Sequence, residues 1–218
     1  MAASRSIQVR SLIKSIRAHF AQQPCSDATI ARELAHVLTL LNRLPASGGD
    51  FAQSGHAVTR HVEAALNGGS ETTAALLEKV RPVIEFLPWH YGYAPRNDAP
   101  DLGQRIAFAE LIGPLAPYRS DSVCLGLTII GPETLYPCHR HPAVELYYVA
   151  AGVATWTLDG VERDHPPGSF ILHPSQAVHA MQTRAQPLLA IYTWSGTDVR
   201  TTSAYTPPAR SAPAEPSH

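Results

Sequence analysis

The run from His139 to Tyr148 constrains the fold of this chain more than any other part of its sequence. It reads His-Arg-His-Pro-Ala-Val-Glu-Leu-Tyr-Tyr, which places two histidines and a glutamate at positions i, i+2 and i+6. Successive side chains of an extended strand alternate between faces, so residues an even number apart share a face. Pro142 must interrupt the strand locally, and Tyr148 must point away from the shared face. The pattern predicts four polar side chains around one point: His139, His141, Glu145 and Tyr147.

From about residue 105 onward the sequence is typical of short β-strands. Five segments are rich in β-branched, aromatic or leucine residues: 106–112, 123–130, 144–150, 154–158 and 188–194. Glycine and proline separate these segments, and Asp159-Gly160 is a strong signal for a two-residue hairpin. Short strands at such close spacing predict a mainly β fold, either a sandwich or a barrel.

The N-terminal third has the periodicity of helices instead. Apolar residues recur at helical spacing in four segments, which span roughly residues 9–20, 30–41, 58–66 and 70–80. We therefore expect a helical region with its connection over residues 1–104, a barrel over 105–200, and a disordered tail over 201–218, where Pro, Ala and Ser dominate. The helices are expected to cover the barrel mouth, to dock on its outside or to build a homodimer.

Composition excludes several classes of partner. The 17 basic and 18 acidic residues give a formal net charge of -1, which argues against nucleic acid or an anionic membrane as a partner. No run reaches the roughly 18 apolar residues that a membrane span needs. The three cysteines, an odd number without metal-motif spacing, favour free thiols in a reducing cytoplasm. The basic first 20 residues loosely resemble a transit peptide, but their apolar spacing favours an amphipathic helix.

Two motifs, in this order, give the ligand run a context. The spacing His139-x-His141-x3-Glu145-x6-Gly152 resembles the first cupin motif, and Pro166-x-Gly168-x5-Pro174-x4-His179 resembles the second. The opening glycine lies slightly further upstream than usual, and the asparagine that often follows the second motif is absent. The resemblance covers about residues 105–196. It implies a small jelly-roll barrel that holds one divalent metal through four ligands: His139, His141, Glu145 and His179.

Three imidazoles and a carboxylate suit Zn, Fe, Mn, Co or Ni, and the sequence does not choose among them. The alternative is a cupin barrel whose polar residues merely line a cavity. His173 lies close to His179 in sequence, but the motif spacing favours His179 as the ligand. We therefore expect His173 to be a polar residue at the rim or in a turn.

A narrower family resemblance surrounds the ligands. Tyr136 precedes the first motif, Tyr147 follows Glu145 by two residues, and Trp194 ends the last strong strand. Together with His-Pro-Ser-x-x-Val-His-Ala and Tyr-Thr-Trp-Ser-Gly, these residues resemble the cupin dimethylsulfoniopropionate (DMSP) lyases of the DddL and DddQ types. The resemblance implies a metal-dependent carbon–sulfur lyase that splits DMSP into dimethyl sulfide and acrylate.

The chemistry of this elimination names the residues that it needs. A base must remove a proton beside a carboxylate, and a metal that neutralises the carboxylate makes that proton more acidic. Tyr147 shares the face of the ligands and is our candidate base, with Tyr136 as a second phenol. Aromatic rings attract a sulfonium cation without competing for the proton. The candidate rings for substrate binding are Trp194, Tyr192 and Trp89, whereas Trp156 in mid-strand is expected in the core.

Two other functions stay open at this point. A cupin dioxygenase would require Fe(II) and O2 and would have no special need for Tyr147. A non-catalytic cupin that senses a small ligand would bind tightly without turnover. The sequence favours the lyase because Tyr136, Tyr147 and Trp194 add to a metal cupin what the cleavage of a small sulfonium carboxylate requires.

Overall fold

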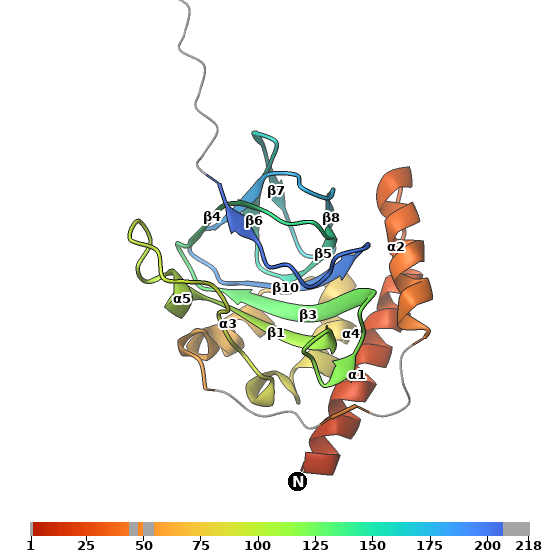
Figure 1. The fold of residues 1–218 in the computed structure, drawn as a ribbon. Coiled ribbons are helices and arrows are strands. Elements are labelled where there is room, and N and C mark those ends of the chain that lie inside the picture. The colour runs from red at the N-terminus through yellow and green to blue at the C-terminus, as the bar shows by residue number, and fades with distance from the viewer. Residues whose placement is uncertain (1, 44–47, 50–54, 207–218) are drawn as a thin grey trace, which may run out of the picture.

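The computed structural model describes residues 2–43, 48–49 and 55–206, with helices first and strands after them (Figure 1). The strands that the sequence predicts are all present, and their bounds differ from expectation by one residue at most. The helices and short 3-10 turns are α1 (Ala2–Gln22), α2 (Ala28–Leu41), η1 (Ala57–His61), α3 (Val62–Leu66), α4 (Glu71–Val80), η2 (Ile84–Phe86) and α5 (Leu102–Arg105). The strands are β1 (Ile106–Gly113), β2 (Tyr118–Arg119), β3 (Val123–Ile130), β4 (Leu135–Arg140), β5 (Val144–Ala151), β6 (Ala154–Leu158), β7 (Val161–His165), β8 (Phe170–His173), β9 (His179–Thr183), β10 (Leu188–Ser195) and β11 (Ala204–Tyr205).

The strands form two sheets that face each other. One has six strands in the order β2-β1-β3-β10-β5-β8, and the other has five in the order β11-β4-β9-β6-β7. Neighbouring strands are antiparallel except for the pair of β1 and β2. The mainly β fold with an N-terminal helical region is therefore confirmed.

Local sequence signals explain several element boundaries. The side chain of Asp27 accepts hydrogen bonds from the backbone N–H groups of Thr29 and Ile30, which caps the start of α2. Between β6 and β7, Asp159 and Gly160 both have positive φ, as a two-residue hairpin requires. The predicted hairpin is confirmed.

The run that carries the ligands is two strands, not one. β4 ends at Arg140 and β5 begins at Val144, and these strands belong to different sheets. Pro142 lies in the bend between them, where no backbone N–H is needed for a strand ladder. The predicted interruption at Pro142 is therefore confirmed, and it is a crossing of the chain from one wall of the barrel to the other among the candidate ligands.

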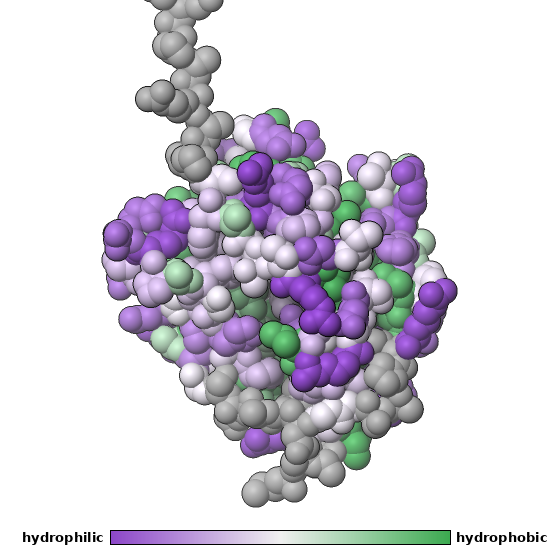
Figure 2. All heavy atoms as spheres, viewed as in Figure 1, coloured by the Kyte–Doolittle hydropathy of each residue, from purple (hydrophilic) through white to green (hydrophobic). Residues whose placement is uncertain are grey.

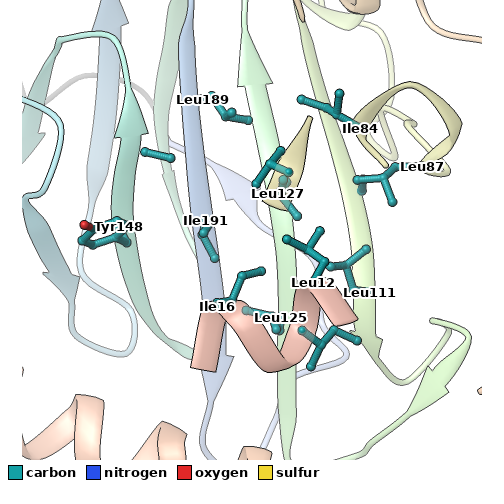
Figure 3. Packing of buried hydrophobic residues seen from close by; sticks show 14 of the residues in the cluster. Leu12, Ile16, Ile84, Leu87, Leu111, Leu125, Leu127, Tyr148, Leu189 and Ile191 are labelled. Atoms are coloured by element: carbon teal, nitrogen blue, oxygen red, sulfur yellow. The ribbon is translucent and has the colours of Figure 1, made fainter. Parts of the chain in front are cut away.

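The six-stranded sheet has one face towards the helices and the other towards the barrel interior. In β3 the odd-numbered residues from Leu125 to Ile129 belong to the apolar cluster that includes α1, α2 and α4, whereas Ile130 belongs to the interior cluster. Figure 3 shows Leu12 and Ile16 of α1 facing the leucine side chains of β3. The helices dock on the outside of the barrel, one of the three arrangements that we expected, and β3 is consequently buried throughout.

Tyr148 points to this helical side, as the alternation along β5 predicts. Its hydroxyl lies 2.6 Å from Nε2 of His19, and its ring packs against Phe20 with 5.4 Å between the ring centroids. Phe20 also contacts Phe170 of β8 at 5.3 Å. These aromatic contacts connect the C-terminal half of α1 to β5, the strand that carries Glu145.

The C-terminal boundary differs from the one that we expect from composition. Ala204 and Tyr205 form β11 and pair with Arg140 and His139 of β4. Ordered pairing therefore continues past residue 200, while residues 207–218 of the expected tail lie outside the described part of the chain. The pairing matters because β11 lies directly beside the strand that carries His139, a predicted ligand.

The surface is mixed in character. Figure 2 shows hydrophobic residues only in small spots among hydrophilic ones on the face in view. Large exposed apolar side chains among the described residues are scattered: Ile7, Leu115, Leu135, Val153 and Val161. None of the helices in residues 2–43 and 55–206 combines the length and apolar character that a membrane crossing demands.

Replacement of Phe20 by alanine is expected to lower the free energy of unfolding by about 3–5 kcal/mol, because it empties a buried aromatic site between α1 and the sheet. Urea denaturation measures this loss. Ile7→Ala on the same helix is the control, since Ile7 is 69% exposed and should change stability by no more than about 0.5 kcal/mol. Equal effects of the two substitutions would show that α1 is not fastened through Phe20.

Candidate active site

The four ligands predicted from the sequence converge from both walls of the barrel. His139 on β4 and His179 on β9 are direct cross-strand neighbours in the five-stranded sheet. Glu145 comes from β5 of the six-stranded sheet, and His141 lies in the bend that joins the two. All four side chains are buried, with at most 2% exposure. The site therefore depends on the two sheets being held face to face.

Three of the four predicted ligands form a tight group. Oε2 of Glu145 lies 3.1 Å from Nε2 of His141 and 3.2 Å from Nε2 of His179. The donor atoms of these three residues all lie within 4.8 Å of one another, in the one such group of three or more side chains found in the described residues. His139 flanks the group, with its ring centroid 4.1 Å from that of His179 and 6.4 Å from that of His141.

The three histidines share one pattern of hydrogen bonding at Nδ1. Nδ1 of His139, His141 and His179 lies 2.7, 3.0 and 2.9 Å respectively from a backbone carbonyl oxygen two residues away in sequence. A carbonyl oxygen only accepts, so each Nδ1 carries a proton, and Nε2 is the nitrogen that would bind a metal. Nε2 of His141 instead donates to Oε2 of Glu145 at 3.1 Å in this structure. Nε2 of His179 is buried and has no hydrogen-bond partner. This donor set fits a divalent transition metal.

Electrostatics favour an ionised carboxylate at the centre of the group. Burial disfavours the charge on Glu145, but the surrounding imidazoles, His141 foremost, hold the pKa of that carboxyl well below its usual range. Burial also disfavours charge on His141, yet the adjacent carboxylate outweighs it and raises the pKa of His141. Burial lowers the pKa of His139 well below its usual value.

The two candidate phenols lie beside the ligands. Tyr136 stacks on His139, with 4.0 Å between ring centroids and 27° between planes. Tyr147 follows Glu145 on the same face of β5 and lies 4.7 Å from the ring of Trp156. Burial, reinforced for Tyr147 by the charge of Glu145, raises the pKa of both phenols well above the ordinary value. Each phenol is consequently protonated at neutral pH unless a positive charge lies nearby.

A cavity of about 520 Å³ opens onto this group. It brings together most of the residues that we predict for the site: Tyr136, His139, Glu145, Tyr147, Tyr192 and Trp194. The ring of Tyr192 lies over Gly126 of the neighbouring strand, where a Cβ atom would stand 2.5 Å from the phenol oxygen. Any larger residue at position 126 would push Tyr192 out of this place. The glycine thus shapes one wall of the cavity.

Trp194 has contacts beyond the lining of the cavity. Its indole Nε1–H donates a 2.8 Å hydrogen bond to Oε1 of Glu145. Its ring stacks on His141 at 4.4 Å between centroids. The side chain is partly buried and lines the cavity, so it is positioned both to hold the carboxylate and to face a bound molecule.

Trp89 is not part of the site. It is buried in the apolar cluster beneath the helices, and its indole N–H donates to the backbone carbonyl of Ile84 at 2.7 Å. The assignment of Trp89 to substrate binding is therefore wrong, because η2 draws its ring towards the helical layer. Trp156 lies in the interior cluster, as expected.

The expectation for His173 is also wrong. This histidine is fully buried on β8, and its Nδ1 lies 3.2 Å from Oε2 of Glu145. No sequence signal revealed β8, so the pairing of His173 with Glu145 follows only from the fold. Phe108 and Glu110 of β1 also line the cavity. They lie two residues apart on a predicted strand, so the sequence alone indicates that they share a face.

Comparisons with known proteins agree with this geometry. The dimethylsulfoniopropionate lyase family model matches residues 30–190. Over 125 residues the chain is 34% identical to the dimethylsulfoniopropionate lyase DddQ of Ruegeria pomeroyi, which covers 55% of this chain and 60% of that protein. Over 145 residues it is 31% identical to a Cereibacter sphaeroides protein named for a DddL lyase, covering 66% and 61%. The chain thus spans about three fifths of the length of each relative.

The likeness extends to the fold. The crystal structure of DddQ from Ruegeria pomeroyi superposes with a TM-score of 0.78 at 26% identity, over 91% of this chain and 96% of that one. The expected cupin barrel is confirmed. Since the family model covers well over half of its residues, this chain belongs to the dimethylsulfoniopropionate lyase family.

Proposed function

We propose that this chain is a carbon–sulfur lyase that cleaves DMSP into dimethyl sulfide and acrylate by β-elimination. The observation that carries the proposal is one cavity lined by two of the candidate metal ligands, His139 and Glu145, by both phenols and by Trp194. Membership of the DMSP lyase family supports the same reaction. The cavity is suited to a small molecule that has a carboxylate at one end and a cation at the other.

The metal is proposed to be held by four side chains: His139, His141, Glu145 and His179. Zn, Fe, Mn, Co and Ni all accept such a set of nitrogen and oxygen donors. When bound, the ion would neutralise the substrate carboxylate and favour the phenolate form of Tyr147. His139 lies slightly outside the tight group, and its Nδ1 hydrogen bond directs Nε2 away from Pro137.

Tyr147 is the proposed base. Its phenolate removes a proton from the carbon next to the substrate carboxylate, and the C–H electron pair forms the new carbon–carbon double bond. The C–S bond breaks with its electron pair on sulfur, so the sulfonium leaves as neutral dimethyl sulfide. Tyr147 keeps the proton and acrylate remains, which balances atoms and charge. Tyr136, stacked on His139, is proposed to orient the substrate from the opposite wall.

Trp194 and Tyr192 are proposed to receive the sulfonium. Aromatic faces attract a desolvated cation by about 2 kcal/mol each and do not compete for the proton. Both rings line the cavity, and Tyr192 lies beside Tyr147 at 6.4 Å between ring centroids. This arrangement places the cation subsite next to the base, as a three-carbon substrate requires.

The decisive experiment is headspace gas chromatography of purified protein incubated anaerobically with DMSP and single divalent metals. We expect dimethyl sulfide, matched by acrylate, with at least one metal. No gas from folded, metal-loaded protein would contradict the lyase. A reaction that appears only with Fe(II) and O2 would indicate a dioxygenase, and ligand binding without turnover would indicate a sensor.

Glu145→Ala and His141→Ala are each expected to lower the bound metal, because each removes a donor from the tight group. Elemental analysis of purified protein after metal loading measures the occupancy. His36→Ala, an exposed histidine on α2, is the matched control and should keep full occupancy. A ligand variant with wild-type metal content would remove that residue from the site.

Tyr147→Phe should reduce kcat by about 10²–10⁴-fold, the usual contribution of a general base, with metal content unchanged. The neighbouring tyrosine provides the control. Tyr148→Phe should keep full activity because that side chain faces α1 on the other side of the sheet. Dimethyl sulfide release measures both variants, and normal turnover by Tyr147→Phe would refute this assignment of the base.

A further inference from the structure

We propose that His173 is a positioning residue that orients two metal ligands, the carboxylate of Glu145 and the ring of His179. The inference rests on the metal site proposed above and adds a residue outside the four cupin ligands. His173 is fully buried, lies on β8 and belongs to no part of the proposed reaction. Its location is determined by the register of three neighbouring strands.

Glu145 is flanked on both sides by residues directly opposite it. β5 pairs with β10 on one side and with β8 on the other, and the register places Trp194 and His173 next to Glu145. Directly opposed residues share a face of the sheet, with Cβ atoms about 4.5–5.5 Å apart. The three side chains therefore form one row across the interior face, with the carboxylate in the middle.

Each oxygen of the carboxylate has its own donor in this row. Trp194 donates from Nε1 to Oε1 at 2.8 Å, and Nδ1 of His173 lies 3.2 Å from Oε2. An ionised carboxylate only accepts hydrogen bonds, so Nδ1 of His173 carries the proton. Two donors at opposite ends prevent rotation of the carboxylate about its terminal torsion. Oε2 is thereby held towards Nε2 of His141 and Nε2 of His179.

The same ring of His173 restrains a second ligand. It stacks on His179 with 3.9 Å between centroids and 26° between planes. His173 is itself enclosed by the rings of Tyr147 and Trp156, each 5.7 Å away. The imidazole of His179 is thus fixed by stacking on one face and by the hydrogen bond from its Nδ1 to the carbonyl of Ala177.

The hydrogen-bond pattern separates His173 from the ligands. Each of the three histidines proposed as ligands directs Nδ1 to a backbone carbonyl, so Nε2 is the nitrogen that would bind the metal. His173 directs Nδ1 to the carboxylate instead, and its Nε2 is buried without a hydrogen-bond partner. A neighbour that hydrogen-bonds a ligand commonly contributes about 10–100-fold to metal affinity. This is the contribution that we assign to His173.

The test compares His173→Asn with His173→Leu. The two new side chains have nearly the same shape, but the asparagine amide nitrogen keeps a donor close to the place of Nδ1. Competition with a chelator measures the cobalt dissociation constant, and the visible spectrum of bound Co(II) reports the ligand geometry. We expect His173→Leu to bind cobalt about 10–100-fold more weakly and to show an altered spectrum. We expect His173→Asn to bind cobalt with nearly wild-type affinity and to show a nearly wild-type spectrum.

Urea denaturation of the metal-free variants shows whether a change in cobalt affinity comes from lost packing. If His173 positions the ligands, His173→Asn and His173→Leu differ in cobalt affinity although their metal-free stabilities are similar. Wild-type cobalt affinity in both variants, or an equal loss in both, would overturn the proposal. If His173→Leu does not fold, His173→Gln replaces it, since its amide lies near Nε2 and leaves the carboxylate without a donor. If the wild-type protein binds cobalt but releases no dimethyl sulfide, the proposed lyase activity is refuted and the positioning role of His173 is not.

Discussion

The buried carboxylate of Glu145 is the group on which the rest of this structure depends. An ionised carboxylate inside a protein costs several kcal/mol unless charge and hydrogen bonds compensate it. Here the compensation comes from His173 and Trp194 of the six-stranded sheet and from His141 in the bend that joins the two sheets. The barrel must therefore close around Glu145 before its charge is tolerated, and the closed barrel in turn presents nitrogen and oxygen donors to a metal.

The helical layer makes such a polar interior possible. Each strand of the six-stranded sheet has two faces, and the helices give the outward one an apolar partner through contacts such as Phe20 with Phe170. Apolar burial on that side supplies stability that does not depend on the cavity. The inward face is then available for phenols, imidazoles and a carboxylate, residue types that would weaken a core built from both faces.

Sequence patterns predicted those features that depend on local order. Strand segments, the Asp159-Gly160 hairpin and the helices follow from periodicity and turn chemistry, because these arise between residues close in the chain. Motif spacing also singled out the four candidate metal ligands, which the fold brings together. The interruption at Pro142 was predicted, but the crossing between two sheets was not, because alternation along one strand does not describe such a bend.

The sequence by itself determined the mainly β class, the set of candidate ligands and the position of Tyr147 and Glu145 on one face, since alternation along a strand is a local property. Only the tertiary structure decided which distant residues meet. It buried Trp89 beneath the helices and brought His173 opposite Glu145. Cross-strand register joins residues that are 28 positions apart in the chain, and it is set by the packing of whole sheets rather than by the residues around either partner.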